Sequence, residues 1–372
     1  MSKLIVKTLI FAALAVFVSK TGMAADEIYR TTHEKPLVVD RVTVESYTEV
    51  KFRKTGGSEQ RLSADKVIRI VYGDQPDAYK RGLRFHNDLD FENAVNSLKL
   101  AMEKKSGRPW IQTYSYLWIA KSYQAWGATD QSKYRDAIAA YEDLLRKDAK
   151  TRFYAEVLLG MAKCYSFSGD LSNAVKTCDR LGKEAYDKKL GVIWEAYAKF
   201  EKAQAKLAAK QFDEAERDFR SSLTFSNEQA GKATDPALVA ELKRLSGLAG
   251  LARGAVLIKK KNYREAKSFF NSILNDENSS VEALAGAQNG LGECSLAEKR
   301  LKDAQSQFAR AKVAYGSVVD EAAKATYYLG VCCLELKNKE PKSKMKARNY
   351  FEEVVSRYGS SIWAKEARKM LK

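Results

Sequence analysis

The chain has 372 residues, of which 45% are hydrophobic and 30% are charged, so it can bury a sizeable core and is not disordered throughout. Only 5 residues are Pro, whereas Ala, Leu, Lys and Glu are abundant, and this composition favours helix over sheet. The formal net charge of +17 predicts attraction to anionic surfaces.

Residues 1–25 have the pattern of a secretory signal peptide. Lys3 and Lys7 form a charged start, residues 4–18 are almost purely apolar, and the small residues Gly22 and Ala24 follow at the positions that a signal peptidase reads. A membrane anchor or a buried helix is the alternative, but the apolar stretch is short for a span. We expect export without a lipid anchor, because no Cys lies near the cleavage point. Nucleic acid is then not an expected partner, whereas anionic lipid, cell-wall polymer or an acidic protein is.

Residues 26–75 alternate between apolar and polar side chains, which is the pattern of β-strands. Val42 and Val44 lie in one such segment, and residues 54–58, with two adjacent glycines, predict a hairpin turn. Residues 60–63 and 67–72 add further strands. We expect a small antiparallel β module of three or four strands, which would be marginal alone and should pack on the helices that follow.

From residue 76 to residue 372 the apolar period becomes that of helices, and one pattern recurs. An Ala is followed four residues later by a bulky residue or Cys, and a Gly or Ala precedes it by twelve or seventeen residues. We predict a mainly α fold, an α-solenoid of about seven helix pairs behind the small antiparallel β module. The small residue of each first helix should meet the Ala of the second, and the bulky residue should fill the gap against the next repeat. The Ala and bulky residues are Ala94/Leu98, Ala137/Tyr141, Ala174/Cys178, Ala215/Phe219, Ala266/Phe270, Ala304/Phe308 and Ala347/Phe351, and the preceding small residues are Gly82, Ala120, Ala162, Ala203, Gly254, Gly292 and Gly330.

This pattern resembles the tetratricopeptide repeat (TPR), whose motif residues 169–174 (Gly-Asp-Leu-Ser-Asn-Ala) and 262–266 (Asn-Tyr-Arg-Glu-Ala) match closely. Residues 347–358 and 361–367 resemble repeats of bacterial periplasmic members, among them the outer-membrane-assembly lipoproteins and the Tol–Pal-associated cell-division coordinator. The resemblance implies a TPR array over residues 76–372. It also implies a scaffold or adaptor in the periplasm or cell envelope that binds proteins through the concave surface of its first helices.

The sequence offers little for catalysis. His33 and His86 are its only histidines and lie far apart in the chain, and the motifs of serine hydrolases, zinc proteases and phosphate-binding loops are absent. The carboxylates are scattered over predicted helix faces, where they are expected to pair with lysine and arginine in solvent. We expect no enzyme activity, no cofactor and no metal site.

The five cysteines lie mostly among small apolar residues of predicted helices. We expect them to be buried as small hydrophobic side chains. Cys164 and Cys178 lie on neighbouring helices of one repeat and are the pair that oxidising conditions after export could join. The others are Cys294, Cys332 and Cys333.

A first candidate binding surface lies in the groove that the resemblance implies. Lys121 and Lys163 directly follow the small residue of the first helix in successive repeats and could form a small cationic spot, with Tyr114 and Tyr197 as groove walls. The Asn of the family's known clamp for a peptide carboxylate is missing. Ordinary surface lysines and core aromatic residues are the alternative interpretation.

A second candidate surface is formed by the turns between paired helices, which become basic in the later repeats. Such turns should lie along one edge of a solenoid, so their cationic side chains would form a stripe, which we call the basic edge. A charge run can also be merely solvated. As a stripe it predicts binding to an anionic cell-wall polymer or membrane surface, the alternative to protein binding. Its residues are Lys259, Lys260, Lys261, Lys299, Arg300, Lys342, Lys344 and Lys346.

Overall fold

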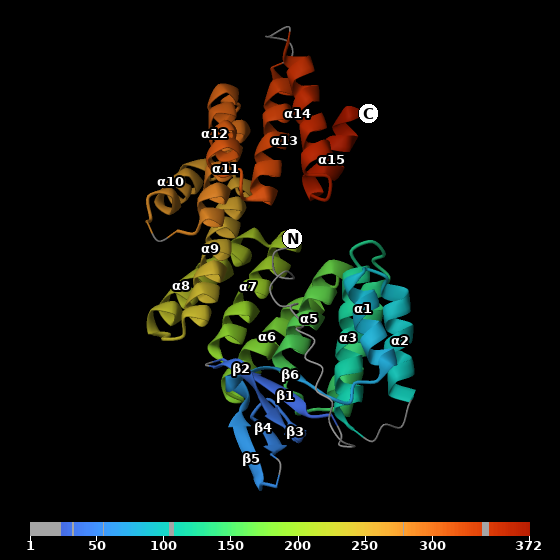
Figure 1. Ribbon diagram of the computed structural model, residues 1–372. Helices are drawn as coiled ribbons and strands as arrows, with labels where there is room; N and C mark the ends of the chain where they lie inside the picture. The colour runs from blue at the N-terminus through green and yellow to red at the C-terminus, as the bar shows by residue number, and fades with distance from the viewer. Residues whose placement is uncertain (1–23, 32, 55, 104–107, 278, 337–341) are drawn as a thin grey trace. The chain divides into compact units, whose positions relative to one another are not determined.

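The computed structural model describes residues 24–372 except 32, 55, 104–107, 278 and 337–341 (Figure 1). The predicted signal peptide lies outside the described residues up to residue 23. The chain forms two compact units, whose described parts belong to residues 24–210 and 211–372. Within these ranges, no helix combines the length and the apolar character needed to cross a membrane.

Within the described residues, the β module has six strands in two antiparallel sheets, so the prediction of three or four strands was too low. One sheet has the strand order β2-β1-β6 and the other the order β3-β4-β5. Glu27 of β1 lies opposite Val38 of β2 on one side and Val71 of β6 on the other. The second pairing joins distant segments, which alternation within each segment cannot reveal. The strands are β1 (Asp26–Arg30), β2 (His33–Val39), β3 (Arg41–Glu45), β4 (Glu49–Arg53), β5 (Glu59–Ser63) and β6 (Val67–Val71).

The predicted hairpin at residues 54–58 is confirmed, since β4 pairs antiparallel with β5. Gly56 has a φ of 68°, a left-handed conformation that glycine adopts without strain. In β3, the alternation of buried and exposed side chains holds only in part. Val42 is buried, but a β-bulge between Val42 and Val44 shifts the pattern and leaves Val44 exposed.

The unit of residues 24–210 continues with helix pairs. Within it, the first helices contact each other in order: α1 touches α3, α3 touches α5, and α5 touches α7. They form one continuous surface, which we call the first-helix face. The helices are α1 (Asp77–Asn87), α2 (Phe91–Glu103), α3 (Trp110–Trp126), α4 (Lys133–Lys147), α5 (Tyr154–Ser168), α6 (Leu171–Asp187) and α7 (Val192–Ala208).

The unit of residues 211–372 has the same organisation, with α9, α11, α13 and α15 in contact in that order. The described chain thus has fifteen helices behind the small β module, so the predicted fold class is confirmed. The helices are α8 (Phe212–Lys232), α9 (Pro236–Lys259), α10 (Tyr263–Leu274), α11 (Val281–Ala297), α12 (Leu301–Ala314), α13 (Val319–Glu335), α14 (Ser343–Arg357) and α15 (Ile362–Leu371).

Side-chain caps begin three of the second helices that the structure describes. One is Asp90 at the start of α2, which accepts a hydrogen bond from the backbone N–H of Asn93 at 3.3 Å. Asp170 accepts a hydrogen bond from the backbone N–H of Asn173, and Asn262 accepts one from that of Glu265. Each bond satisfies an N–H group at the start of a helix, which has no partner within the helix. The turns at Asp170 and Asn262 are the segments that match the repeat motif most closely in sequence.

The recurring small and bulky residues pack together. The glycine of the first helix meets the bulky residue of the second helix, and a Cβ added at Gly82 would also lie 3.3 Å from the carbonyl oxygen of Ala94, the Ala expected to face it. A Cβ added at Gly82 would lie 2.6 Å from Leu98, and one at Gly330 would lie 2.7 Å from Phe351. The bulky residue also meets the next repeat, as expected: a Cβ at Gly160 would lie 2.5 Å from the ring of Tyr141.

The β module packs on the edge of its unit where successive repeats are connected, which confirms that the strands rest on the helices. Tyr72 stacks on Trp110, the first residue of α3, with ring centroids 4.3 Å apart. Tyr47 lies 5.9 Å from the ring of Tyr154, the first residue of α5, and its backbone N–H donates to the carbonyl of Lys150 at 3.0 Å. Burial of these rings attaches the small sheets to the array.

Candidate binding site

A buried ion pair ties the first strand to the start of α3. The guanidinium of Arg108 donates to both carboxylate oxygens of Asp26, at 2.6 and 3.1 Å, and to Asp74 at 2.9 Å. The backbone N–H groups of Val42 and Gly73 donate to Asp26 at 2.7 and 3.1 Å. Asp26 is fully buried. Removing one partner of such a pair costs about 3–5 kcal/mol, so this cluster holds the β module in place.

A second buried cluster surrounds Glu45 at the end of β3. Its carboxylate accepts hydrogen bonds from the hydroxyls of Tyr72 and Tyr114, at 2.6 and 2.8 Å, and from Nε of Arg152 at 2.8 Å. Burial, followed by the charge of Glu45, raises the pKa of both tyrosines. Tyr114 therefore contacts the β module in the core and is not the groove wall that the sequence suggested.

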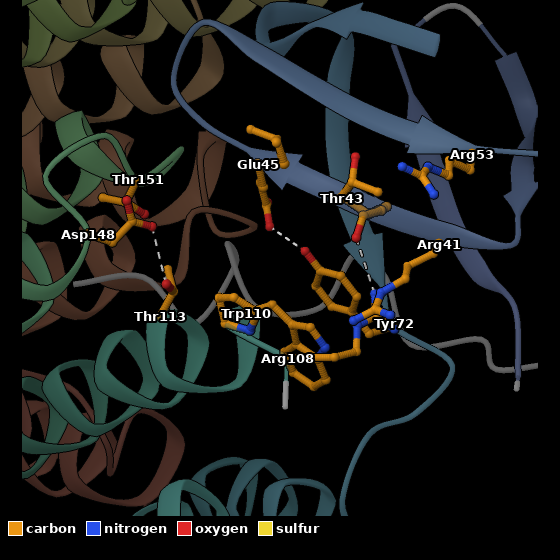
Figure 2. A pocket seen from close by; sticks show the side chains of 13 residues that line it. Arg41, Thr43, Glu45, Arg53, Tyr72, Arg108, Trp110, Thr113, Asp148 and Thr151 are labelled. Atoms are coloured by element: carbon orange, nitrogen blue, oxygen red, sulfur yellow. Dashed lines mark hydrogen bonds between the residues drawn. The ribbon is translucent and has the colours of Figure 1, made fainter. Parts of the chain in front are cut away.

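A cavity of about 400 Å³ lies between β3, the start of α3 and the connection before α5 (Figure 2). Every residue of β3, from Arg41 to Glu45, contributes to its lining, and β3 is an edge strand of its sheet. The cavity therefore runs along that edge. Its volume falls within the range of small-ligand sites, about 300–1,000 Å³. No sequence motif marks it, because its lining comes from separate strands, a helix start and a turn.

The cavity has a cationic end and an acidic end. Figure 2 shows Arg41 and Arg53 at one end and Thr113, Asp148 and Thr151 at the other. Arg41 and Arg53 lie directly opposite each other on β3 and β4. Like charges in this position repel each other.

Asp148 is half-buried at the acidic end. Its carboxylate accepts a hydrogen bond from the hydroxyl of Thr113 at 3.2 Å. Burial raises the pKa of Asp148, and the bonds from Thr113 and from the backbone of Lys150 offset this only in part. Carboxylates with a raised pKa in a cavity are frequent at binding sites.

The lysines predicted to form a cationic spot lie on the first-helix face, but each is paired with an acid. Nζ of Lys121 lies 2.5 Å from Glu156 on α5, and Nζ of Lys163 lies 3.3 Å from Glu201 on α7. Each pair thus bridges successive first helices. The spot is a row of ion pairs, not an uncompensated positive charge.

Aromatic rings lie beside these lysines. Nζ of Lys121 is 4.8 Å from the ring centroid of Trp118, and Nζ of Lys163 is 5.9 Å from that of Tyr197. Tyr197 is partly exposed, as a groove wall should be. On this face each lysine therefore has a carboxylate and a ring beside it, although the ring comes from the lysine's own helix at Lys121 and from the next first helix at Lys163.

The other unit carries the same kind of pair with its charges exchanged. Glu293 of α11 pairs with Lys324 of α13. Relative to the small residues of their helices, Glu293 stands where Lys121 does, and Lys324 where Glu156 does. At this place in the repeat, the lysine of the ion pair is thus on the earlier first helix in one unit and on the later first helix in the other.

The basic edge lies at the connections α9–α10 and α11–α12 and at the start of α14, where Lys344 and Lys346 fall within the helix, and part of it is neutralised. Lys260 pairs with Asp213 and Glu216, both at 2.7 Å. Lys299 and Arg300 pair with carboxylates of α13 and α12 at 3.7 and 2.5 Å. Five further members are exposed and form no ion pair with any residue that the structure describes: Lys259, Lys261, Lys342, Lys344 and Lys346.

The remaining reactive side chains are placed in structural roles. Nδ1 of His86 lies 2.9 Å from the hydroxyl of Ser122, and burial together with Lys121 lowers the pKa of His86 to about 4. All five cysteines are buried free thiols, as expected. No group of three or more His, Cys, Asp or Glu side chains in the described ranges is arranged to hold a metal ion.

Comparison with known proteins supports the repeat fold. Residues 128–190 match the tetratricopeptide repeat family. No curated protein is similar enough to count as a match. A tetratricopeptide repeat protein from Parabacteroides merdae is similar in structure, with 18% identity and a TM-score of 0.50 over 79% of this chain and 96% of that chain. The apo form of the quorum sensor NprR from B. thuringiensis has 13% identity and a TM-score of 0.49, over 79% of each chain.

These similarities establish the architecture. The family match spans α4 to α6, and the similarity to the Parabacteroides merdae protein extends over most of the chain. The helical repeats are therefore of TPR type, as the resemblance implied. Because identity is below one-fifth, the likeness concerns the fold alone.

Proposed function

We propose that this protein is a non-enzymatic scaffold or adaptor that binds a partner protein along its first-helix face. The observation that carries the proposal is that Lys121 and Lys163, at equivalent positions of successive repeats, each pair with a carboxylate of the next first helix and lie beside an aromatic ring. The charged side chains are partly exposed, so a partner can reach them. Charges and rings on successive helices of a repeat array suit the recognition of an extended protein segment.

A double charge exchange tests this proposal. Lys121→Glu combined with Glu156→Lys keeps an ion pair between α3 and α5, in the polarity that Glu293 and Lys324 already show. It reverses the charges that a partner meets. After cross-linking in the bacterial envelope, we expect the proteins captured by the native chain, identified by mass spectrometry, to be lost from the variant while its Tm stays unchanged.

A matched control exchanges an exposed pair on a second helix, Asp143→Arg with Arg146→Asp on α4. This variant should capture the same proteins as the native chain. Equal capture by all three proteins would contradict binding at the first-helix face. Equal loss from both variants would show that the face has no special role.

We further infer that the protein is exported and acts in the bacterial periplasm or cell envelope. The charged, apolar and small-residue segments of residues 1–25 support this, as does the resemblance of residues 347–367 to periplasmic repeats. The first strand begins at Asp26, next to the expected cleavage point. Protein isolated from the native envelope should begin near Ala25 or Asp26 by mass spectrometry, and an intact Met1 would argue against export.

A second candidate function is binding of an anionic cell-wall polymer or membrane surface through the basic edge. The observation that favours it is the set of five exposed lysines there that lack an acidic partner among the described residues. Several such lysines can act together on a polyanion. This function differs from the first in its sensitivity to salt, which provides its test.

A further inference from the structure

We propose that the cavity between β3 and α3 binds a short peptide with free ends, whose carboxylate is held by Arg41 and Arg53 and whose ammonium group is held by Asp148. This site lies at the β module and is independent of the first-helix face. Among the residues that the structure describes, the charges in the centre of the cavity wall are paired with opposite charges of the protein, whereas the charges at its two ends are not.

The two central charges of the wall are compensated inside the protein. Arg108 is neutralised by Asp26 and Asp74, and its bond to the carbonyl of Val42, at 3.4 Å, uses a further N–H group. Glu45 is neutralised by Arg152 and receives two tyrosine hydroxyls. Neither group needs a ligand, so both serve to shape the cavity.

The cationic end is not compensated in this way. Neither Arg41 nor Arg53 forms an ion pair with any residue in the described part of the chain. Glu59 on β5 lies opposite Arg53 in the strand register but forms no ion pair with it, and its carboxylate accepts a hydrogen bond from the hydroxyl of Thr43 at 2.7 Å. Both side chains line this end of the cavity, and each guanidinium carries paired N–H donors that match the two oxygens of a carboxylate.

At the acidic end of the cavity, a negative charge lacks a cationic partner within the described part of the chain. Asp148 receives hydrogen bonds from Thr113 and from the backbone of Lys150, but no lysine or arginine pairs with it among the described residues. A half-buried carboxylate without a cation is stabilised by a ligand that supplies one. A single ligand that carries a carboxylate at one end and an ammonium group at the other would satisfy both ends.

The wall between the ends favours a peptide over other molecules with these two charges. β3 is an edge strand, and edge strands present N–H and C=O groups that match the main chain of an extended peptide. The N–H and C=O of Val42 are taken by Asp26 and Arg108. A peptide would therefore meet the strand beyond this point, at Thr43 and Val44.

Calorimetric titration of the whole chain with three related peptides tests the inference. The probes are trialanine, its N-acetylated form and its C-terminal amide. We expect trialanine to bind at least tenfold more tightly than either blocked form, because each block removes one terminal charge. The proposal is wrong if the native chain does not bind trialanine at millimolar concentration. It is also wrong if the native chain binds all three peptides equally.

Variants then assign each end of the ligand. With Arg41→Gln and Arg53→Gln together, trialanine and its amide should bind equally weakly. With Asp148→Asn, trialanine and its acetylated form should bind equally weakly. The controls Arg61→Gln and Asp65→Asn remove exposed charges of the β module outside the cavity and should keep the native preference. Loss of preference in the controls would show that the cavity is not the site.

Discussion

The ring of Phe270 occupies the space that a side chain on Gly254 would need. A Cβ at Gly254 would come within 3.0 Å of this ring, and so would one at Gly290 of the next repeat. The ring is thus held between glycines of two successive first helices. This relationship explains why small and bulky residues recur together: the ring can lie between the helices only where no side chain projects toward it.

Gly254→Ala should destabilise the protein. At an open helical position this change stabilises by about 0.5–1 kcal/mol, but here the added methyl group collides with a buried ring, and overpacking costs about 1–3 kcal/mol. Urea unfolding measures the difference. Gly231→Ala on α8 is the control, since a Cβ there meets nothing within 4 Å, and it should stabilise slightly. A Gly254 variant as stable as the native chain would contradict the contact.

Lys261→Gly should stabilise the protein although it removes a side chain. Lys261 has a φ of 62°, a left-handed conformation that costs a non-glycine residue about 1 kcal/mol. Glycine relieves that strain at a turn where the side chain is exposed. Lys346→Gly, at an exposed position inside α14, should instead destabilise by about 1 kcal/mol. Thermal unfolding of the two variants measures both effects. Shifts of the Tm in the same direction would disprove the prediction.

Lys260→Gln should lower stability at neutral pH and much less in acid. Burial tends to raise the pKa of Glu216, but bonds from Lys260 and nearby arginines lower it below its usual 4.5. The ion pair therefore stabilises the fold above about pH 4.5 and is lost as pH falls through the lowered pKa. We expect a loss of about 1 kcal/mol at pH 7 by urea unfolding, and almost none near pH 3. Lys259→Gln, which removes an unpaired charge, should show no such pH dependence.

The helical array could be predicted because its signal is local and repeated. Ala266 and Phe270 stand in a fixed spacing that recurs along the chain, so chance matches at single positions did not matter. The β module lacks such redundancy. That β1 pairs with β6 depends on Glu27 meeting Val71, a contact between distant segments that no periodicity encodes.

The cavity was not predictable for a similar reason. Its lining combines Arg41 and Arg53 from the strands with Asp148 from a turn between helices, and only the folded chain brings them together. In the sequence, buried Asp26 and Arg108 are indistinguishable from solvated charges. Likewise, Lys121 looked like a free cation because its partner Glu156 lies on the next first helix.

The cysteines should be unreactive in the native protein. Burial raises the pKa of Cys164 to about 12, so almost no thiolate forms at pH 8, and reagents cannot reach the buried sulfur. A thiol assay should detect no reactive groups in the native chain and all five after unfolding without reductant. Detection of only three after unfolding would reveal a disulfide, with Cys164 and Cys178 as the first pair to examine.

Binding to a polyanion should depend on the unpaired members of the basic edge. Lys259, Lys261 and Lys344 are exposed and unpaired among the described residues, so reversing them to Glu should weaken retention on anionic liposomes and cell-wall material without unfolding the protein. Salt screens such contacts within about 10 Å at 0.1 M, so retention should fall steeply as salt is added. Reversing Lys54, Arg61 and Lys66 in the β module changes net charge equally and should weaken retention far less. Equal loss in both variants would mean that only net charge matters, and equal retention in both would exclude the basic edge as the binding surface.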